Sequence, residues 1–278
     1  MDTTNPLRQF FRQPAIHIRL PSLGRYYPPG ALTETANGEY PVLPMTTMDE
    51  ITYRTPDALF NGSAVASVIQ SCVPAIRDAW QMPNVDLDTV LIAVRIASYG
   101  HDLDLGSVCP SCSNEADYTI DLRSVLEKIG ADLYDQPLTL GDLEFRFRPL
   151  TYRQVNTNNM AQFEEQKRMQ ALDRAENDEQ RATIMSDLLR RLTDVTTNAV
   201  AHSIASITAG DVTVADAANI HEYLTNCDRA TFNTVKNHVI ECKAASEIKP
   251  VRLKCTNCGH QYEQSFTLDM SNFFADAS

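Results

Sequence analysis

Two pairs of cysteines carry the clearest chemical signal in the sequence. Cys109 and Cys112 form one C-x2-C motif, and Cys255 and Cys258 form a second. Each pair lies between two stretches with strand-like alternation, 103–108 and 117–122 around the first pair and 250–254 and 261–268 around the second. Four thiolates from two such turns are a ligand set of structural Zn2+. The sequence therefore predicts a closed, structural zinc site with four cysteine ligands that joins two distant segments.

The same cysteines allow other chemistry, which the surrounding sequence disfavours. A pair of disulfides or a redox dithiol is one alternative, but a thioredoxin-like motif opens a helix, whereas strands are expected after both pairs here. A catalytic zinc ion would keep one position open and would normally have His or carboxylate ligands. His260, two residues after Cys258, is the alternative ligand, and we expect it to be exposed instead. The long spacer 113–254 departs from the short spacer of a usual zinc ribbon, so it must return the chain to its starting point.

No other pattern predicts catalysis. The sequence contains no phosphate-binding loop, no G-x-G-x-x-G and no H-E-x-x-H, and no serine lies in a nucleophile elbow. Asp102 and Asp104 lie beside His101, but we expect these strand carboxylates to face solvent. The other three cysteines are expected to be buried and unreactive: Cys72, Cys227 and Cys242. We therefore expect no catalytic residue, no cofactor other than zinc and no enzymatic activity.

The chain of 278 residues has a net charge of −12 and a pI of about 4.9, which argues against nucleic-acid binding. The charge is uneven, because residues 1–30 contain four arginines and only one acidic residue, Asp2: Arg8, Arg12, Arg19 and Arg25. A basic arm on an acidic body favours docking onto an acidic neighbour, such as another copy of the chain. The alternative is that these arginines are solvated. No apolar run reaches the ~20 residues of a membrane span, and no signal-peptide core is present, so we expect an intracellular site of synthesis with reduced thiols.

The first hundred residues predict an extended arm and then short helices. In this part we expect strands over 16–20 and 40–43 and helices over 57–60 and 63–72. Thr47 and Glu50 fit a capping box. Asp86 is the predicted cap of a helix over 87–98, which is apolar nearly all round and is expected to be the central buried helix. Arg95 within this helix is expected to form an internal ion pair, because buried charges are usually paired.

The remaining residues predict longer helices and one more strand. Leu143, Phe145 and Phe147 alternate with charged residues, as in a half-buried strand. Helices are expected within 151–206, over 215–226 and over 231–245. The very polar stretch 164–181 predicts a protruding hairpin or a solvated helix face. Two aromatic residues near the end, Phe273 and Phe274, are expected to fold back or to dock on a partner.

Together these elements predict an α+β fold. It has a mainly helical body, an extended N-terminal arm, and a split zinc-ribbon-like β unit built from the two C-x2-C turns. The predicted division of the chain is an arm (1–45), a helical core with the first cysteine turn (46–123), a strand with a helical insertion (124–246), and the second cysteine turn with the C-terminal tail (247–278).

Several short motifs occur in an order that is similar to a known family. They are LPSLGRYY at 20–27, PMT at 44–46, ALFNGSA at 58–64, SCVP at 71–74, IAVRIASYG at 92–100, CPSC at 109–112 and FRPL at 147–150. They resemble the baseplate hub proteins of T-even-type contractile-tail bacteriophages over residues 16–155, and more loosely to the C-terminus. The resemblance implies a protein of the virion tail baseplate, made in the host cytoplasm, that works with other baseplate and tail proteins and has no enzymatic activity. The only site residues that the resemblance implies are the two cysteine pairs, as the ligands of a metal site.

Three functions remain open at this point. The first is a structural component of the baseplate hub region that holds neighbouring tail proteins together and associates with itself in a ring. The second is an assembly factor that helps to build the hub and is absent from the mature virion. The third is a zinc-ribbon nucleic-acid-binding protein. The acidic charge counts against the third function, as does the sparse set of basic residues within five positions of Cys255: Arg252, Lys254 and His260.

Overall fold

The computed structural model describes residues 6–130, 132–171 and 178–265, and it divides into two compact units. Unit 1 contains residues 1–82, 86–129 and 247–278, and unit 2 contains residues 83–85 and 130–246. Both units contain helices and strands, so the predicted mixture of the two is confirmed. The division into four parts stays a prediction.

Unit 1 begins with an arm that pairs with itself. Strand β1 (Ile16–Ile18) is antiparallel to β2 (Tyr40–Val42), as the alternating sequence predicts. The helical elements are η1 (Pro6–Phe10), α1 (Thr47–Tyr53), α2 (Pro56–Phe60), α3 (Ser63–Cys72), η2 (Ala79–Gln81), α4 (Leu87–Tyr99) and α5 (Leu122–Leu126), and η3 (Asn84–Asp86) lies where the two units divide. Helix α4 is buried continuously from Thr89 to Arg95, which confirms it as a central helix.

One predicted helix cap is wrong, and a second is confirmed in position but not in its hydrogen bond. Helix α1 is capped by Thr46 instead of Thr47, because Asp49 and not Glu50 returns the reciprocal hydrogen bond of the capping box. Asp86 precedes α4 but its side chain makes no cap. Its carboxylate accepts hydrogen bonds from the Ser22 backbone N–H at 2.8 Å, the Ser22 hydroxyl at 2.6 Å and the Tyr27 hydroxyl at 2.9 Å. Asp86 therefore ties the arm to the start of the central helix.

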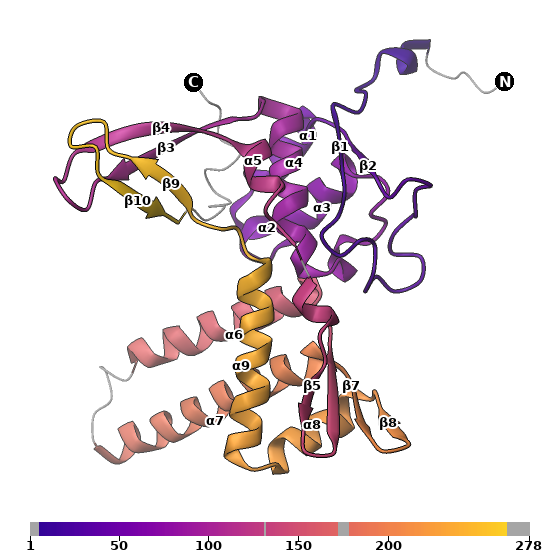
Figure 1. Ribbon diagram of the computed structural model, residues 1–278, viewed down its shortest axis with the longest axis vertical. Coiled ribbons are helices and arrows are strands. Elements are labelled where there is room, and N and C mark those ends of the chain that lie inside the picture. Colours follow the sequence, from indigo (N-terminus) through magenta and orange to yellow (C-terminus); the bar gives the residue numbers. More distant parts are fainter. Residues whose placement is uncertain (1–5, 131, 172–177, 266–278) are drawn as a thin grey trace. The chain divides into compact units, whose positions relative to one another are not determined.

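Two ribbons of two antiparallel strands complete unit 1. Strand β3 (Asp102–Val108) pairs with β4 (Glu115–Asp121), and β9 (Val251–Lys254) pairs with β10 (Gln261–Gln264). In Figure 1 the β9–β10 ribbon lies alongside the β3–β4 ribbon. All four are the strands that were predicted around the cysteines. The last one is shorter than its prediction, and residues 266–268 lie outside the described part of the chain.

Unit 2 combines a sheet with long helices. The sheet is antiparallel with the order β5-β6-β7-β8, and its strands are β5 (Leu138–Leu140), β6 (Leu143–Phe147), β7 (Ile204–Ala209) and β8 (Val212–Val214). The helical elements are η4 (Asp132–Asp135), α6 (Tyr152–Ala171), α7 (Asp178–Ser203), α8 (Ala217–Asn226) and α9 (Arg229–Ser246). Helices α6 and α7 form a hairpin (Figure 1). The core of the unit contains Phe145, Ile204 and Ile220, which are each at most 1% exposed.

The sequence predicts this sheet only in part. Strand β6 and all four long helices are confirmed, but the predicted helical region 151–206 is wrong at its end, where β7 begins at Ile204. No glycine or proline separates α7 from β7, so no local signal marks the change. The strand forms because Ile207 pairs opposite Phe145 of β6, which is a long-range contact.

Candidate metal centre

The two cysteine turns have the same backbone structure. In the first turn the Cys109 N–H donates to the Asn114 carbonyl at 2.9 Å, and the Ser113 N–H donates to the Cys109 carbonyl at 2.9 Å. In the second turn the Cys255 N–H donates to the His260 carbonyl at 2.8 Å, and the Gly259 N–H donates to the Cys255 carbonyl at 3.0 Å. The two sets of bonds connect equivalent positions, so the predicted repeat of strand, cysteine turn and strand is confirmed.

One position of each turn adopts a left-handed backbone conformation. Ser113 has φ of +56° and Gly259 has φ of +73°. They occupy the same place, one residue after the second cysteine of each pair. Glycine adopts this conformation without steric cost, whereas serine does not. The strained Ser113 indicates that the turn is held in shape by the contacts around it.

The two turns bring the four cysteine sulfurs together within unit 1. All four Sγ atoms lie within 4.8 Å of one another. The distance from Cys109 to Cys258 is 3.8 Å and that from Cys112 to Cys255 is 3.6 Å. A tetrahedral ion with Zn–S bonds of ~2.3 Å needs sulfurs about 3.8 Å apart. The donor atoms and their spacing therefore fit Zn2+, and all four cysteines are free thiols in the structure.

The turns stabilise negative charge on sulfur unevenly. The backbone N–H groups of Cys258 and Asn257 outweigh the effect of burial and, with the neighbouring thiols, lower the pKa of Cys255 to about 6. The backbone N–H of His260 has the same effect on Cys258, but proton sharing with Cys112, Cys255 and Cys109 raises the pKa of Cys258 to about 11. The protein's own groups therefore do not ionise all four thiols together. A bound dication would supply the missing positive charge.

A few polar contacts join the ribbons beside the sulfurs. Ser107 of β3 lies 3.0 Å from the Tyr262 hydroxyl and donates to Gln264 Oε1 at 2.9 Å, both on β10. The Asn257 amide reaches Cys112 Sγ at 3.8 Å. The neighbouring Tyr262 hydroxyl raises the pKa of Tyr118 to about 12. Sequence reasoning missed these residues, although Ser107, Tyr118 and Tyr262 all lie within the predicted strands.

The other candidate groups lie apart from the sulfurs. His260 is exposed and stacks on Tyr262, with ring centroids 6.3 Å apart. His101 is 3.6 Å from Asp102, and Asp104 accepts a hydrogen bond from Thr119. Both carboxylates are exposed, as predicted. Three cysteines also lie outside the cluster, of which Cys72 and Cys242 are buried and Cys227 is partly buried.

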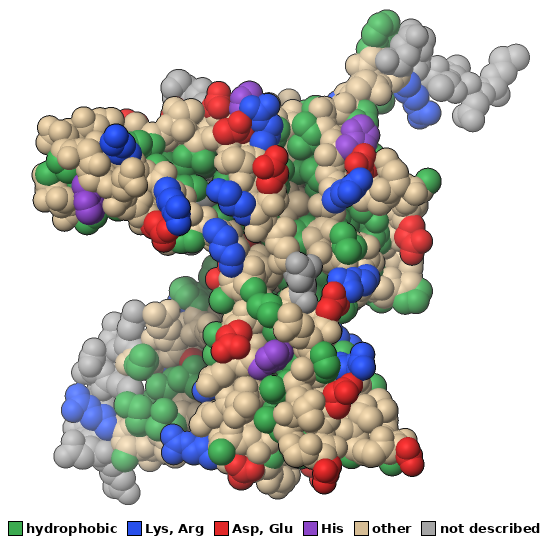
Figure 2. Space-filling view, in the orientation of Figure 1, with side chains coloured by type: hydrophobic (Ala, Val, Ile, Leu, Met, Phe, Trp, Pro, Cys, Tyr) green, Lys and Arg blue, Asp and Glu red, His purple; other side chains and the backbone are tan. Residues whose placement is uncertain are grey.

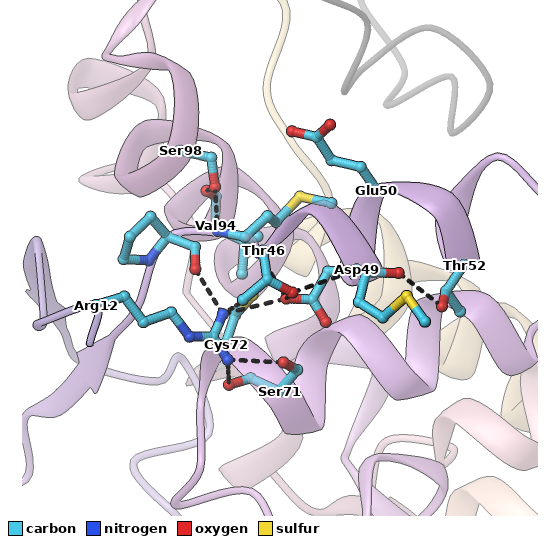
Figure 3. Close-up of polar contacts among 12 residues, drawn as sticks. Arg12, Thr46, Asp49, Glu50, Thr52, Ser71, Cys72, Val94 and Ser98 are labelled. Atoms are coloured by element: carbon cyan, nitrogen blue, oxygen red, sulfur yellow. Dashed lines mark hydrogen bonds and ion pairs between the residues drawn. The ribbon is translucent and has the colours of Figure 1, made fainter. Parts of the chain in front are cut away.

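One arginine of the predicted basic arm, Arg12, is bonded to groups within the chain. Its guanidinium donates to the Pro44 carbonyl at 2.6 Å and to the carbonyl and hydroxyl of Ser71 at 2.8 and 2.7 Å (Figure 3). It also lies 3.1 Å from Asp49 Oδ2. Burial would raise the pKa of Asp49, but Thr46, Ser71 and Arg12 together hold it below its usual value. Arg12 is therefore an internal anchor of the arm and is not available to a partner, in contrast to Arg19, whose side chain is 70% exposed.

The buried Arg95 was expected to form an ion pair. The structure places its guanidinium 5.5 Å from the centre of the Tyr99 ring, one helical turn further along α4. Burial lowers the pKa of Arg95, and the arginine is 2% exposed.

Within the described ranges, none of the helices has the length and hydropathy needed to cross a membrane.

Comparison with known proteins identifies a family for this chain. The model of a family described as "T4 bacteriophage base plate protein" matches residues 37–275. The match includes both cysteine pairs and excludes the arm before residue 37. No curated protein and no solved structure matches this chain.

Proposed function

We propose that this chain, which belongs to the T4 bacteriophage base plate protein family, is a permanent subunit of the hub region whose shape is held by a structural metal ion. Membership of the family places the chain in the virion tail, in a structural role in the baseplate, with other tail proteins as its partners. The position in the hub, the metal and self-association in a ring are parts of the proposal.

The cluster of four sulfurs is the observation that supports the metal. Each of the two ribbons has only two strands, and a two-stranded ribbon is marginally stable without further support. The direct polar contacts between them that involve Ser107 and Asn257 are few. Zn2+ held by Cys109, Cys112, Cys255 and Cys258 would contribute its binding energy directly to the folding of this region.

The proposed ion is structural, and we propose no enzymatic activity. When bound, it would supply positive charge that neutralises the four thiolates. Four cysteine ligands fill a tetrahedral coordination sphere and leave no position for water or substrate. The residues of the turns then act only to hold the ligands, through the N–H groups of Asn257 and Cys258 and the left-handed Ser113 and Gly259.

The alternative role is that of an assembly factor that leaves before the virion matures. Quantitative mass spectrometry of purified mature phage separates the two roles. A fixed whole-number ratio to known tail proteins would support a permanent subunit. Absence from mature particles together with presence in assembly intermediates would replace this proposal with the assembly factor. The nucleic-acid alternative gains no support, because Arg252 beside the second turn is paired with Glu263 at 3.3 Å.

A further inference from the structure

The end of the N-terminal arm exposes large apolar side chains. Leu7, Phe10 and Phe11 are 60%, 75% and 55% exposed. Figure 2 shows hydrophobic and basic side chains together at this end of the arm. A single exposed apolar residue is ordinary, but three within five residues mark a contact surface. We call residues 7–11 the arm tip.

The arm tip leaves the body of unit 1 beside helix α1. The residue that follows it, Arg12, lies 3.1 Å from Asp49 of α1 and donates to the Pro44 carbonyl just before this helix (Figure 3). This anchor fixes the point at which the tip begins. Leu7 is five residues before Arg12, so the tip extends at most about 17 Å from the anchor. A tip of this length contacts only what a neighbour places close to α1.

Helix α1 carries an exposed apolar face of its own. Met48 and Ile51 are three residues apart, which puts them on one side of the helix, and they are 68% and 57% exposed. Thr52 and Thr55 continue this side, because their hydroxyls donate to the carbonyls of Met48 and Ile51. The hydroxyl hydrogens are thereby used within the chain. We call these four residues the α1 face, and the tip of the same chain leaves it uncovered.

The two surfaces have opposite charge. Arg8 is exposed and is the only charged residue of the tip. Residues 47–60, which form α1 and α2, contain more acidic than basic residues: Asp49, Glu50 and Asp57 against Arg54. Arg12 neutralises Asp49, and an excess of negative charge still remains there. Charge complementarity therefore favours contact of a tip with the α1 face and disfavours contact between two tips.

We propose that the arm tip of one copy of this chain packs on the α1 face of a second copy. The inference rests on the self-association that is part of the proposed function, and it names the two surfaces. Because the tip begins beside the α1 face, two copies with these faces toward each other exchange their tips reciprocally. Such a contact is isologous and closes at two copies. A ring would then be assembled from these pairs.

The area of the contact is that of a weak specific interface. Five large apolar side chains take part in each contact, three from the tip and two from the α1 face. Each would bury on the order of 100 Å2. Two reciprocal contacts then bury on the order of 1,000 Å2, which is the lower limit of specific interfaces. We therefore expect a reversible pair with a Kd in the micromolar range.

Sedimentation equilibrium of the full-length chain tests the tip. Phe10→Ala with Phe11→Ala should weaken self-association at least about a hundredfold, because both contacts of the pair lose two aromatic side chains. Urea unfolding of this variant should be unchanged, since both residues are exposed. Arg8→Glu should weaken self-association about tenfold. Arg19→Glu is the matched control, with the same charge change on the arm outside the tip, and it should remain within about twofold of wild type.

A mixing experiment tests the α1 face. Met48→Ser with Ile51→Ser removes this face and keeps the tip, so the variant alone should be as weakly associated as the tip variant. In a mixture of the two variants, each pair of unlike chains regains one intact contact. Energy transfer between differently labelled chains should therefore be higher in the mixture than in either variant alone. Met185→Ala with Leu189→Ala changes two exposed apolar residues of α7 and should leave association unchanged.

Three results would overturn the proposal. A wild-type chain that is monomeric at every concentration up to about 100 μM excludes the pair, and an arm that tail assembly still requires would then bind a different tail protein. Self-association that the tip variant leaves unchanged puts the contact elsewhere and leaves the proposed self-association intact. A mixture that associates no better than the tip variant alone excludes the α1 face. None of these results depends on the metal, which chelation tests separately.

Discussion

Replacing Cys255 by serine should remove the metal and separate the two ribbons. The sulfur of Cys255 is buried, with the residue 2% exposed, and its thiolate is stabilised by the N–H groups of Cys258 and Asn257. Serine preserves the size of the side chain but cannot supply a thiolate. The three remaining sulfurs would leave the tetrahedral site open.

The magnitude follows from the length of chain that the metal closes. A metal that joins Cys112 to Cys255 closes the spacer 113–254 into a loop. A cross-link over a loop of this length contributes about 5 kcal/mol in the chain-entropy treatment. The hydrogen bonds of Ser107 to Tyr262 and Gln264 contribute only about 1 kcal/mol each. We therefore expect Cys255→Ser to lower the free energy of unfolding of the whole chain by about 5 kcal/mol, since the spacer is a free chain only when unit 2 is unfolded as well.

Three measurements check this expectation. Metal analysis should find one zinc per wild-type chain and almost none in Cys255→Ser. Urea unfolding should show the loss of stability in the variant and, to a similar degree, in wild type treated with a chelator, with no further effect of chelator on the variant. Hydrogen exchange should increase in β3, β4, β9 and β10, while the β5–β8 sheet of unit 2 serves as an internal reference. Cys227→Ser is the matched control, because Cys227 lies outside the sulfur cluster.

The reasoning is refuted if Cys255→Ser retains a full equivalent of metal. It is also refuted if chelation changes the wild-type free energy of unfolding by less than about 1 kcal/mol, since the metal cross-link would then contribute little to stability. Equal losses in Cys255→Ser and Cys227→Ser would indicate a general sensitivity to substitution in place of a metal site.

Three further predictions concern the arm. Burial raises the pKa of the fully buried Asp86 to about 6. Its contribution to stability is therefore present below about pH 4 and is lost as pH rises through about 6, a change of about 3 kcal/mol. Asp86→Asn should flatten the urea-derived stability between about pH 4 and 6, and an unchanged slope there would contradict the assignment. Arg12→Ala should lower the free energy of unfolding by about 2 kcal/mol and speed proteolysis of the arm. Arg12→Lys should not restore the lost stability, because lysine lacks the planar guanidinium that bonds several partners at once. Arg19→Ala, which removes an exposed ion pair, should change stability little. Deleting residues 1–11, before the Arg12 anchor, should leave urea unfolding unchanged but reduce incorporation into tails; normal incorporation would exclude a role of this segment in assembly.

The cysteine turns were predictable because their information is local. The spacing of Cys109 and Cys112 and of Cys255 and Cys258, with alternating residues on both sides, is enough to define a strand, a turn and a strand. The helices α4, α8 and α9 were also predictable, since each has a continuous helical pattern of apolar residues.

The errors occur where distant residues decide the structure. Asp86 has the sequence context of a helix cap, but Ser22 and Tyr27 take its hydrogen bonds. Arg12 belongs to a basic stretch, but Ser71 and Asp49 hold it inside the protein. These contacts are far apart in sequence, and no local pattern specifies them.

The long spacer between the cysteine pairs, which sets this chain apart from a usual zinc ribbon, has a structural explanation. Both pairs belong to unit 1, and residues 130–246 between them belong to unit 2. The spacer is therefore largely a compact unit inserted between the two ribbons and not a flexible loop. The chain leaves unit 1 after β4 and α5 and returns to it at β9. A metal held by both ribbons would join the outgoing and returning segments of unit 1.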